Sequence, residues 1–359
     1  MSLSSGSYQV NSNEELPKSY CEPGHTAVFL LNLGAPSSSN VYDVRKYLKQ
    51  FLSDPRVIDI YPIARWLLLR LIILPFRTPK SAKAYESIWG KNGSPLLINS
   101  KSLLYKVSIQ LGWTFKVALG MRYGEPSIEQ ALNSLDLFKC KKLIILPLFP
   151  HYASASTGSA VEESMALLSK STIITEVSIC GDFLNHPGYI SSLSSKIEQY
   201  SKDHHFDYLL MSYHGLPERQ VLKSESTNRC NLSSACPKIN SDNRYCYRAQ
   251  CYETSRLLAE ELCLPENKWG VSFQSRLGRI PWIKPYTDEE LKRLRKIGIK
   301  KLAICCPSFV ADCLETLEEI GIGAKEQWLE IGGDSLDLIP CLNDDDLWAT
   351  TVVNIIKNN

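Results

Sequence analysis

Eight short apolar runs recur along the chain with helix-length segments between them, and this alternation limits the possible folds more than any other feature. They cover residues 27–33, 115–119, 143–149, 173–179, 208–213, 269–273, 302–306 and 328–331. Short, nearly all-apolar strands that alternate with helices are typical of parallel sheets covered on both faces. Because 359 residues exceed what one core usually organises, we predict an α/β fold of two lobes, each a four-stranded parallel sheet flanked by helices.

The boundaries of these lobes follow from the places where the alternation pauses. We expect a polar lead-in over residues 1–24, a first lobe over 25–180, a second lobe over 181–342 and a C-terminal helix over 343–359 that packs back on the first lobe. Residues 218–254 interrupt the second lobe, because this stretch is polar, rich in turn-forming residues and contains four cysteines. We predict that it forms a cysteine-rich insertion at the surface.

The charge balance and the N-terminus restrict the possible partners and the compartment. Forty basic and 38 acidic side chains give a formal charge of +2, which does not indicate a nucleic-acid partner. The first residues lack the basic and apolar regions of a secretory signal. Twelve cysteines in such a chain favour reduced thiols and metal ligation over disulfides. We therefore expect a cytoplasmic protein.

The longest apolar stretch runs from Trp66 to Phe76 and is interrupted by Arg70. It is well short of the roughly 20 residues that a membrane-spanning helix needs. Two interpretations remain, a buried helix and an apolar lip that touches a membrane surface. The second interpretation predicts peripheral contact with the inner face of the membrane.

The most informative polar residues follow the predicted strands, where ligands bind in open parallel sheets. His214 stands at the end of the fifth run, and its position favours a function although a lone histidine is more often structural. Asp312, Glu315 and Glu319 follow the seventh run with the spacing of one helical face. A helix dipole alone would account for Asp312. A line of carboxylates along a cleft can instead relay protons or guide a divalent cation.

Seven blocks of the sequence, in this order and spacing, resemble the ferrochelatase family from about Ala27 to the end of the chain. They include MRYGEPSIEQAL, PLFPHYASASTGSA, SYHGLPER, SFQSRLGRIPWIKPYTDEEL and PSFVADCLETLEEIGI. The resemblance implies two Rossmann-like lobes of the chelatase type with the active cleft between them. It also implies a lyase of haem biosynthesis that inserts Fe²⁺ into protoporphyrin IX, giving protohaem and two protons.

The resemblance also implies roles for individual residues. His214 matches the proton acceptor for the pyrrole nitrogens and Glu315 a residue of proton or metal transfer, and both match ligands of the substrate iron. The positions that match substrate-binding residues are Leu33, Arg77, Lys80, Ser94, Arg122, Tyr123, Trp282, Phe309, Asp312 and Glu319. Relatives that act on coproporphyrin carry tyrosine at the position of Leu33, so the apolar residue favours protoporphyrin.

Four cysteines of the insertion have the spacing C-x5-C-x9-C-x4-C and are Cys230, Cys236, Cys246 and Cys251. Four thiolates suit either a 2Fe-2S cluster or a structural Zn²⁺ ion. Some bacterial ferrochelatases carry four cysteines in a short internal segment, so the resemblance implies the 2Fe-2S cluster, with zinc as the alternative. We do not expect Cys263, Cys305, Cys306 or Cys313 to be ligands.

Two other functions compete with iron insertion. A cobalt chelatase of tetrapyrrole synthesis would share the fold, but such enzymes generally have clefts richer in histidine, and this chain has six histidines. A non-catalytic porphyrin or haem carrier would use the same cleft. The presence of both His214 and Glu315 argues against a carrier, because a carrier needs no proton acceptor.

Overall fold

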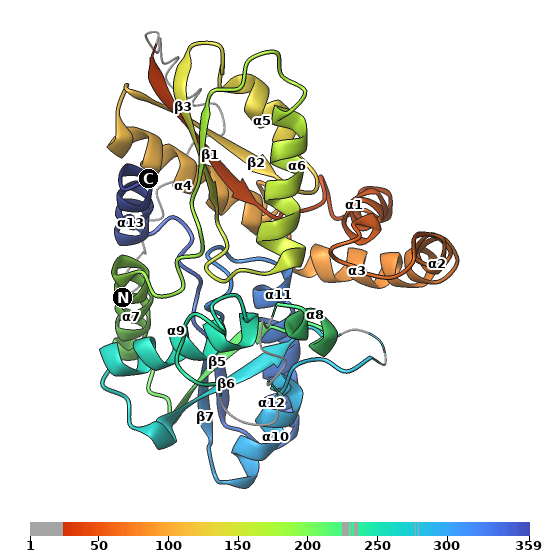
Figure 1. Cartoon of the computed structure of the whole chain (residues 1–359). Helices are drawn as coiled ribbons and strands as arrows, with labels where there is room; N and C mark the ends of the chain where they lie inside the picture. The colour runs from red at the N-terminus through yellow and green to blue at the C-terminus, as the bar shows by residue number, and fades with distance from the viewer. Residues whose placement is uncertain (1–23, 225–229, 231, 233–235, 277, 279) are drawn as a thin grey trace.

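The computed structural model describes residues 24–224, 230, 232, 236–276, 278 and 280–359, so the predicted lead-in lies outside the described residues except for its last position. Two four-stranded parallel sheets form two lobes, one above the other (Figure 1). The first sheet has the order β2-β1-β3-β4 and the second the order β6-β5-β7-β8. The strands are β1 (His25–Asn32), β2 (Phe115–Met121), β3 (Cys140–Pro147), β4 (Glu176–Ile179), β5 (Tyr208–His214), β6 (Trp269–Gln274), β7 (Lys301–Cys305) and β8 (Ser335–Leu338).

Helices connect the strands and cover both faces of each sheet. Those from the first half of the chain are α1 (Val41–Ser53), α2 (Pro62–Leu67), the π-helix η1 (Leu68–Ile73), α3 (Leu74–Ile88), α4 (Pro95–Leu111), α5 (Ile128–Ser134), the π-helix η2 (Ser154–Gly158) and α6 (Ser159–Leu168). Those that follow are α7 (Pro187–Asp203), α8 (Glu218–Leu222), α9 (Tyr247–Glu261), the 3-10 helix η3 (Glu266–Lys268), α10 (Thr287–Lys296), α11 (Leu314–Leu317), the π-helix η4 (Glu319–Ala324), α12 (Lys325–Glu330) and α13 (Asp346–Lys357).

Alternate residues of the central strands enter different cores, as the two-residue period of a strand requires. In β1, Val28 and Leu30 enter a large core, whereas Phe29 enters a smaller core on the opposite face of the sheet. Met211 and Tyr213 of β5 enter the same large core as Val28 and Leu30. One apolar core therefore continues from the first sheet to the second and holds the lobes together.

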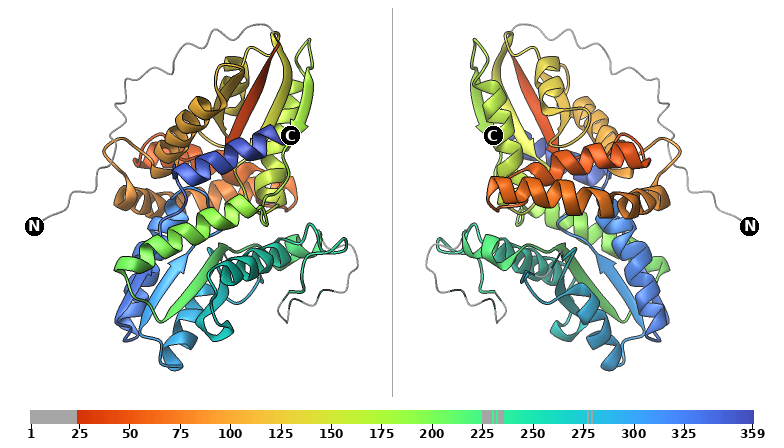
Figure 2. Two further views of the ribbon diagram at one scale, coloured as in Figure 1. Left: turned by 90° about the vertical axis from the view of Figure 1, so that its left-hand side faces the viewer. Right: turned by 90° about the vertical axis from the view of Figure 1, so that its right-hand side faces the viewer.

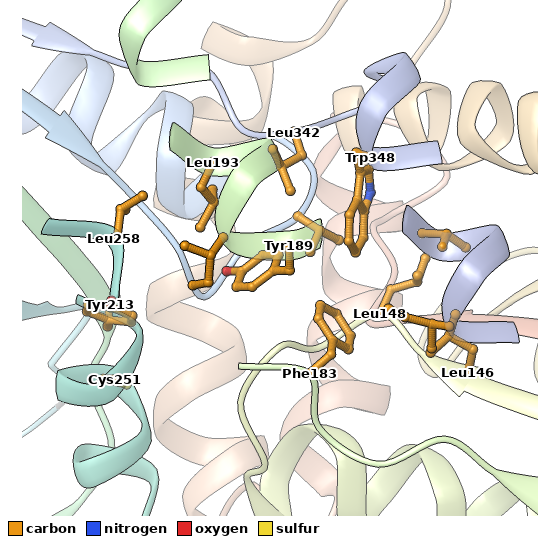
Figure 3. Packing of buried hydrophobic residues seen from close by; sticks show 14 of the residues in the cluster. Leu146, Leu148, Phe183, Tyr189, Leu193, Tyr213, Cys251, Leu258, Leu342 and Trp348 are labelled. Atoms are coloured by element: carbon orange, nitrogen blue, oxygen red, sulfur yellow. The ribbon is translucent and has the colours of Figure 1, made fainter. Parts of the chain in front are cut away.

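Helices α4, α7, α9 and α13 also contribute to this shared core. Tyr189 of α7 and Trp348 of α13 are fully buried, and their ring centroids lie 5.9 Å apart with Phe183 against both (Figure 3). Helix α13 lies against α4 of the first lobe and α7, near the junction of the lobes (Figure 2). The last helix of the chain thus stabilises the arrangement of the two sheets.

Residues 328–331 are the one predicted strand that is wrong. They belong to α12 and the turn after it, and the eighth strand is β8. Ile320, Ala324 and Trp328 are buried together in the core beneath the second sheet. A spacing of four residues places side chains on one face of a helix, so this period, and not the apolar run 328–331, was the relevant signal.

Two further elements differ from expectation at their boundaries. Helix α11 begins at Leu314, so Asp312 precedes the helix and does not share a helical face with Glu315. Helix α9 begins at Tyr247, within the stretch 218–254 that was expected to be irregular. Its buried side chains pack beneath the second sheet, and this tertiary packing outweighs the polar composition of the segment.

The apolar stretch from Trp66 to Phe76 is helical throughout and has two different faces. Leu69 and Ile73 are buried against Leu52. On the other face, Leu71 is 63% exposed and Phe76 is 77% exposed. None of the helices in the described part of the chain combines the length and the apolar character that crossing a membrane requires.

Candidate active site

In each sheet the chain first adds a strand on one side of its starting strand and then adds the remaining strands on the other side. The starting strand and its neighbour on that other side form the switch point of the sheet. In the first sheet this pair is β1 and β3, and in the second sheet it is β5 and β7. A crevice forms beyond the carboxyl ends of such a pair, and ligands bind there in open α/β sheets. His214 is the last residue of β5, and its backbone N–H donates to Ser308 Oγ after β7 at 3.2 Å. The structure therefore places His214 at the switch point of the second sheet.

The hydrogen bond of the His214 ring defines which nitrogen carries a proton. Nδ1 lies 2.6 Å from the carbonyl oxygen of Gly215. A carbonyl oxygen can only accept a hydrogen bond, so Nδ1 must be the donor, and the neutral ring keeps its lone pair on Nε2. The rings of Trp282 and Phe309 lie 6.4 and 6.3 Å from the imidazole, centroid to centroid. The neutral form of His214 thus has one tautomer, and the ring lies between two aromatic side chains.

A second histidine, His151, follows β3 at the corresponding edge of the first sheet. It is buried, and Nε2 forms a 2.9 Å hydrogen bond with Thr254 Oγ1 of the second lobe. Burial lowers the pKa of His151 to about 3, so this ring remains neutral near pH 7. His151 therefore fits a structural contact between the lobes better than proton transfer.

Gln274 joins the histidine strand to the acidic segment, which we define as residues 312–319. It is the last residue of β6 and pairs in register with His214. Its Nε2 donates to the backbone oxygen of Glu315 at 2.6 Å and to the Glu319 carboxylate at 3.3 Å. Its Oε1 accepts from Ser212 Oγ at 2.7 Å. Since Gln274 is buried and uses both ends of its amide, it fixes the acidic segment relative to β5.

The three predicted site acids, Asp312, Glu315 and Glu319, have different surroundings. Glu319 accepts hydrogen bonds from the backbone N–H of Ser275, at 2.7 Å, and from the hydroxyl of the same residue. Asp312 is buried and accepts from Thr316 Oγ1, the Cys341 backbone and Asn343 Nδ2. Both carboxylates are held by the protein itself, whereas Glu315, the third of these predicted site acids, has no comparable set of donors among the described residues.

Glu315 faces the first lobe. Burial raises the pKa of Tyr47 and Tyr85, and the nearby charge of Glu315 raises both further. Leu314, beside Glu315, packs against the same apolar cluster as Leu33 and the two tyrosines. The carboxylate of α11 is therefore positioned by a contact between the lobes.

Arg122 and Tyr123 lie in a polar network at the end of β2. Arg122 Nη2 and the Tyr123 hydroxyl donate to the same oxygen of Asp54, at 2.9 and 2.8 Å, and Arg122 Nε donates to Ser159 at 2.7 Å. Tyr123 and Asp54 are buried. Burial raises the pKa of Asp54, but hydrogen bonds from Ser159, the Arg56 backbone and Tyr123, together with the Arg122 charge, lower it more, so the net shift is downward.

The remaining predicted substrate-binding residues lie at different depths. Leu33 is partly buried at the end of β1, Ser94 is buried at the start of α4, and Trp282 is buried beside His214. Arg77 and Lys80 are exposed on α3. Burial and the charge of Glu319 raise the pKa of Glu318, whereas the charge of Lys80 lowers it, so α3 reaches the acidic segment electrostatically.

A cavity of about 650 Å³ lies between the lobes, a volume within the usual range of ligand sites. Arg56, Tyr152 and Ser154 line it from the first lobe, and Leu216 and Tyr247 line it from the second. The Tyr247 hydroxyl donates to the backbone oxygen of His214 at 2.9 Å. The cavity therefore lies beside the predicted catalytic histidine but does not include its ring.

Sequence reasoning did not single out Asp54 or Gln274, although both lie in the family-like blocks. Each is a buried polar side chain that binds several elements distant in sequence. The apolar surroundings of Gln274 at the end of a strand offered a weak signal. Nothing local marks Asp54, because its partners come from other parts of the chain.

The four cysteines of the predicted cluster lie close enough to influence one another electrostatically. Cys236, Cys246 and Cys251 are buried and Cys230 is half-buried. Burial raises the pKa of Cys236, Arg248 lowers it, and the charges of Cys246 and Cys230 raise it, so that the net shift is upward. Within the described residues, no three His, Cys, Asp or Glu side chains are arranged to hold a metal ion.

Solved structures show which fold this chain shares. The sirohydrochlorin chelatase SirB from Bacillus subtilis subspecies spizizenii, in complex with cobalt, has a TM-score of 0.52 at 9% identity, over 93% of this chain and 94% of its own. SirB from Bacillus subtilis with Fe3+ has a TM-score of 0.50 at 12% identity, over 93% and 95% of the two chains. These identities show the fold alone, which is that of the two-lobed chelatases.

Comparison of sequences narrows this class to one family. The ferrochelatase family matches residues 25–359. Ferrochelatase of Coxiella burnetii (strain CbuK_Q154) is 50% identical over 333 residues, which cover 92% of this chain and 93% of the relative. Ferrochelatase of Legionella pneumophila subsp. pneumophila (strain Philadelphia 1) is 50% identical over 330 residues, 92% of this chain and 98% of the relative. The chain belongs to the ferrochelatase family and is a metal chelatase of haem biosynthesis that inserts ferrous iron into a porphyrin.

The network around Asp54 predicts how stability depends on pH. The folded pKa of Asp54 is depressed, so its stabilisation is present above the unfolded value of about 3.9 and is lost as the pH falls through the folded value. We expect Asp54→Asn to reduce the loss of stability between about pH 5 and pH 2, measured by urea unfolding. Asp203→Asn, at the exposed end of α7, is the control and should keep the wild-type profile. Identical profiles for wild type and Asp54→Asn would show that Asp54 is not a source of the acid sensitivity.

Proposed function

We propose that His214 accepts protons from the pyrrole nitrogens as iron enters the ring. The observation that carries this proposal is the Nδ1 hydrogen bond to the Gly215 oxygen, because it leaves the Nε2 lone pair available. The protonated ring keeps the same hydrogen bond, so proton transfer needs no rotation of the side chain. The aromatic rings of Trp282 and Phe309 flank it and suit a flat macrocycle.

Glu315 is the partner of His214 in this proposal and moves a proton or the metal. Its neighbours Asp312 and Glu319 bind protein donors with both carboxylate oxygens, whereas Glu315 faces tyrosines of the other lobe. Glu319 and Asp312 then act by holding the segment in place. His214 and Glu315 together would present one nitrogen and one carboxylate to Fe²⁺, which are ligand types that divalent iron accepts.

The proposed porphyrin is protoporphyrin IX, with protohaem as the product. Leu33 packs among Val44, Tyr47, Tyr85 and Tyr123, and its apolar side chain offers no hydrogen bond to an additional carboxylate of coproporphyrin. Exposed Arg77 and Lys80 are available to carboxylates at the edge of the macrocycle. The proposed floor of the site consists of Ser94, Arg122 and Tyr123. Asp54 holds Arg122 and Tyr123 in place by accepting hydrogen bonds from both.

A peripheral contact with the inner face of the membrane, from the cytoplasmic side, completes the proposed setting. The exposed face of α2, η1 and α3 carries large apolar side chains that no described element covers, among them Leu71 and Phe76. Contiguous exposed apolar residues commonly mark interaction or membrane-binding surfaces. A membrane would also be the natural source of an apolar substrate such as protoporphyrin.

Cys230, Cys236, Cys246 and Cys251 are proposed to hold a 2Fe-2S cluster, with zinc as the alternative. The donor chemistry fits, because four thiols lie in one region and three of them are buried. The buried guanidinium of Arg248 donates from Nη1 to Cys236 Sγ at 3.0 Å, which would offset the negative charge of a thiolate site. A cluster would supply one-electron redox capacity and would link the segment before α9 to Cys251 in that helix.

The role of His214 can be tested by His214→Ala. Removal of a general base typically lowers turnover by about 10²- to 10⁴-fold, and porphyrin binding should persist because the side chain is only half-buried. The assay is the anaerobic loss of free-porphyrin fluorescence with Fe²⁺, using protoporphyrin IX and coproporphyrin III in parallel. His204→Ala, in an exposed position after α7, is the control. A decrease below about tenfold would remove His214 from the mechanism.

Glu315→Gln should lower turnover more than it weakens porphyrin binding, because the amide keeps the shape but cannot exchange a proton. We expect a reduction in kcat of at least about 10²-fold, measured in the same assay, and a smaller reduction for Glu319→Gln. Glu330→Gln, on the exposed side of α12, serves as the matched control. Wild-type turnover of Glu315→Gln would show that this carboxylate is structural.

The cluster proposal predicts that anaerobically purified protein is red-brown and contains about two iron atoms per chain. Each of the single changes Cys230→Ser, Cys236→Ser, Cys246→Ser and Cys251→Ser should abolish the visible absorption. Cys263→Ser, an exposed position outside the set, should retain it. Colourless protein with one zinc atom per chain would replace the cluster by the zinc alternative, and four free thiols without metal would exclude both.

A further inference from the structure

A second cavity, of about 390 Å³, lies on the outer side of the first lobe between α1 and the α2–η1–α3 segment. Four cationic side chains line it, and they are Arg45, Lys49, Arg65 and Arg70. Its other walls are mostly apolar, with Trp66, Leu69 and Leu74. We refer to this cavity as the basic groove.

The cations of the basic groove have no carboxylate partner within 4.0 Å among the described residues, in contrast to the many ion pairs elsewhere. Arg45 and Arg65 donate to backbone oxygens, of Leu74 at 3.4 Å and of Ile58 at 3.1 Å. The Arg70 guanidinium lies 5.1 Å from the centre of the Trp66 ring. Four like charges around one cavity repel each other, so an anion in the groove would be stabilised by all of them.

The rim of the groove is the apolar face of the same helices. Ile63 and Trp66 of α2 are 62% and 54% exposed, and Leu71 and Ile72 of η1 are 63% and 56% exposed. Trp66 belongs to both the groove and this face. Helices α1, α2 and α3 project from the side of the first lobe (Figure 1), so a flat surface can reach them.

We propose that the basic groove binds the headgroup phosphate of an anionic phospholipid in a bilayer while the apolar rim enters the acyl region. This inference rests on the proposed peripheral membrane contact and deepens it by naming the lipid class. Cations combined with tryptophan and leucine on one helical surface are typical of attachment to anionic membranes. A free anion would use the cations but would leave the apolar rim exposed, so the bilayer accounts for both observations.

The test is vesicle co-sedimentation of the full-length protein with phosphatidylcholine alone and with phosphatidylcholine containing phosphatidylglycerol. We expect stronger binding to the anionic vesicles, and weakening of this preference at high salt. Lys49→Gln/Arg70→Gln should lower binding to anionic vesicles by about tenfold or more. Neither the Lys49 nor the Arg70 side chain forms a hydrogen bond with a described residue, and Arg70 contacts the Trp66 ring. Lys292→Gln/Lys296→Gln on α10 of the second lobe is the charge-matched control and should bind like wild type.

The outcomes separate the headgroup site from the membrane contact itself. Equal wild-type binding to neutral and anionic vesicles would overturn the headgroup site but keep an apolar contact, which Leu71→Ser/Ile72→Ser should then abolish. Binding to neither vesicle would overturn both. Titration with inorganic phosphate that shows Lys49- and Arg70-dependent binding without vesicle binding would show a free-anion site and also overturn the proposal. Turnover of a soluble porphyrin should be unchanged in each of these double variants, which confirms their folding.

Discussion

The shared apolar core between the two sheets is the constraint on which the rest of the molecule depends. Side chains from β1 and β5 enter the same core, and Tyr189 and Trp348 fill the space between them. The Tyr189 hydroxyl also donates to the backbone oxygen of Pro307, in the segment after β7. Close packing of this kind allows little sliding, so the carboxyl edges of both sheets are held at one cleft. Without this core, the position of His214 relative to the residues of the first lobe would not be fixed.

Polar side chains that are buried and fully bonded then set the finer geometry. Gln274 connects β5, β6 and the acidic segment, and Asp54 connects α1, β2 and α6. An unsatisfied buried donor or acceptor would cost about 1–3 kcal/mol, so these networks tolerate few alternative arrangements. As a result, residues of similar type have different hydrogen-bonding states. Asp312 and Glu319 are occupied by protein donors, whereas Glu315 and His214 Nε2 remain available for chemistry.

The outer helices of the first lobe, α1, α2 and α3, differ from the core because they leave apolar and cationic side chains exposed. The π-helix η1 and helix α3 bury apolar side chains against α1, whereas the outer face of α2, η1 and α3 is exposed beside the unpaired cations of the basic groove. In water this surface is unfavourable, because apolar side chains and like charges gain nothing from one another. An anionic bilayer satisfies both at once. The first lobe carries this surface and also contributes one wall of the cleft between the lobes, which suits the proposed use of a porphyrin that is soluble in lipid.

The sequence determined the number of lobes, the parallel character of the sheets and seven of the eight strands, because apolar runs report directly on burial on both faces of a strand. It also determined the family, since blocks such as SYHGLPER and PSFVADCLETLEEIGI are local in sequence. It failed at 328–331, where the helical period of Ile320, Ala324 and Trp328 outweighed a short apolar run. Only the tertiary structure decided that His214 keeps Nε2 free, that Asp312 is a buried acceptor and that Asp54 and Gln274 organise the site. The physical reason is that each of these properties depends on a hydrogen-bond partner fixed by the folded backbone, in most cases one distant along the chain, and spacing along a sequence does not encode that geometry.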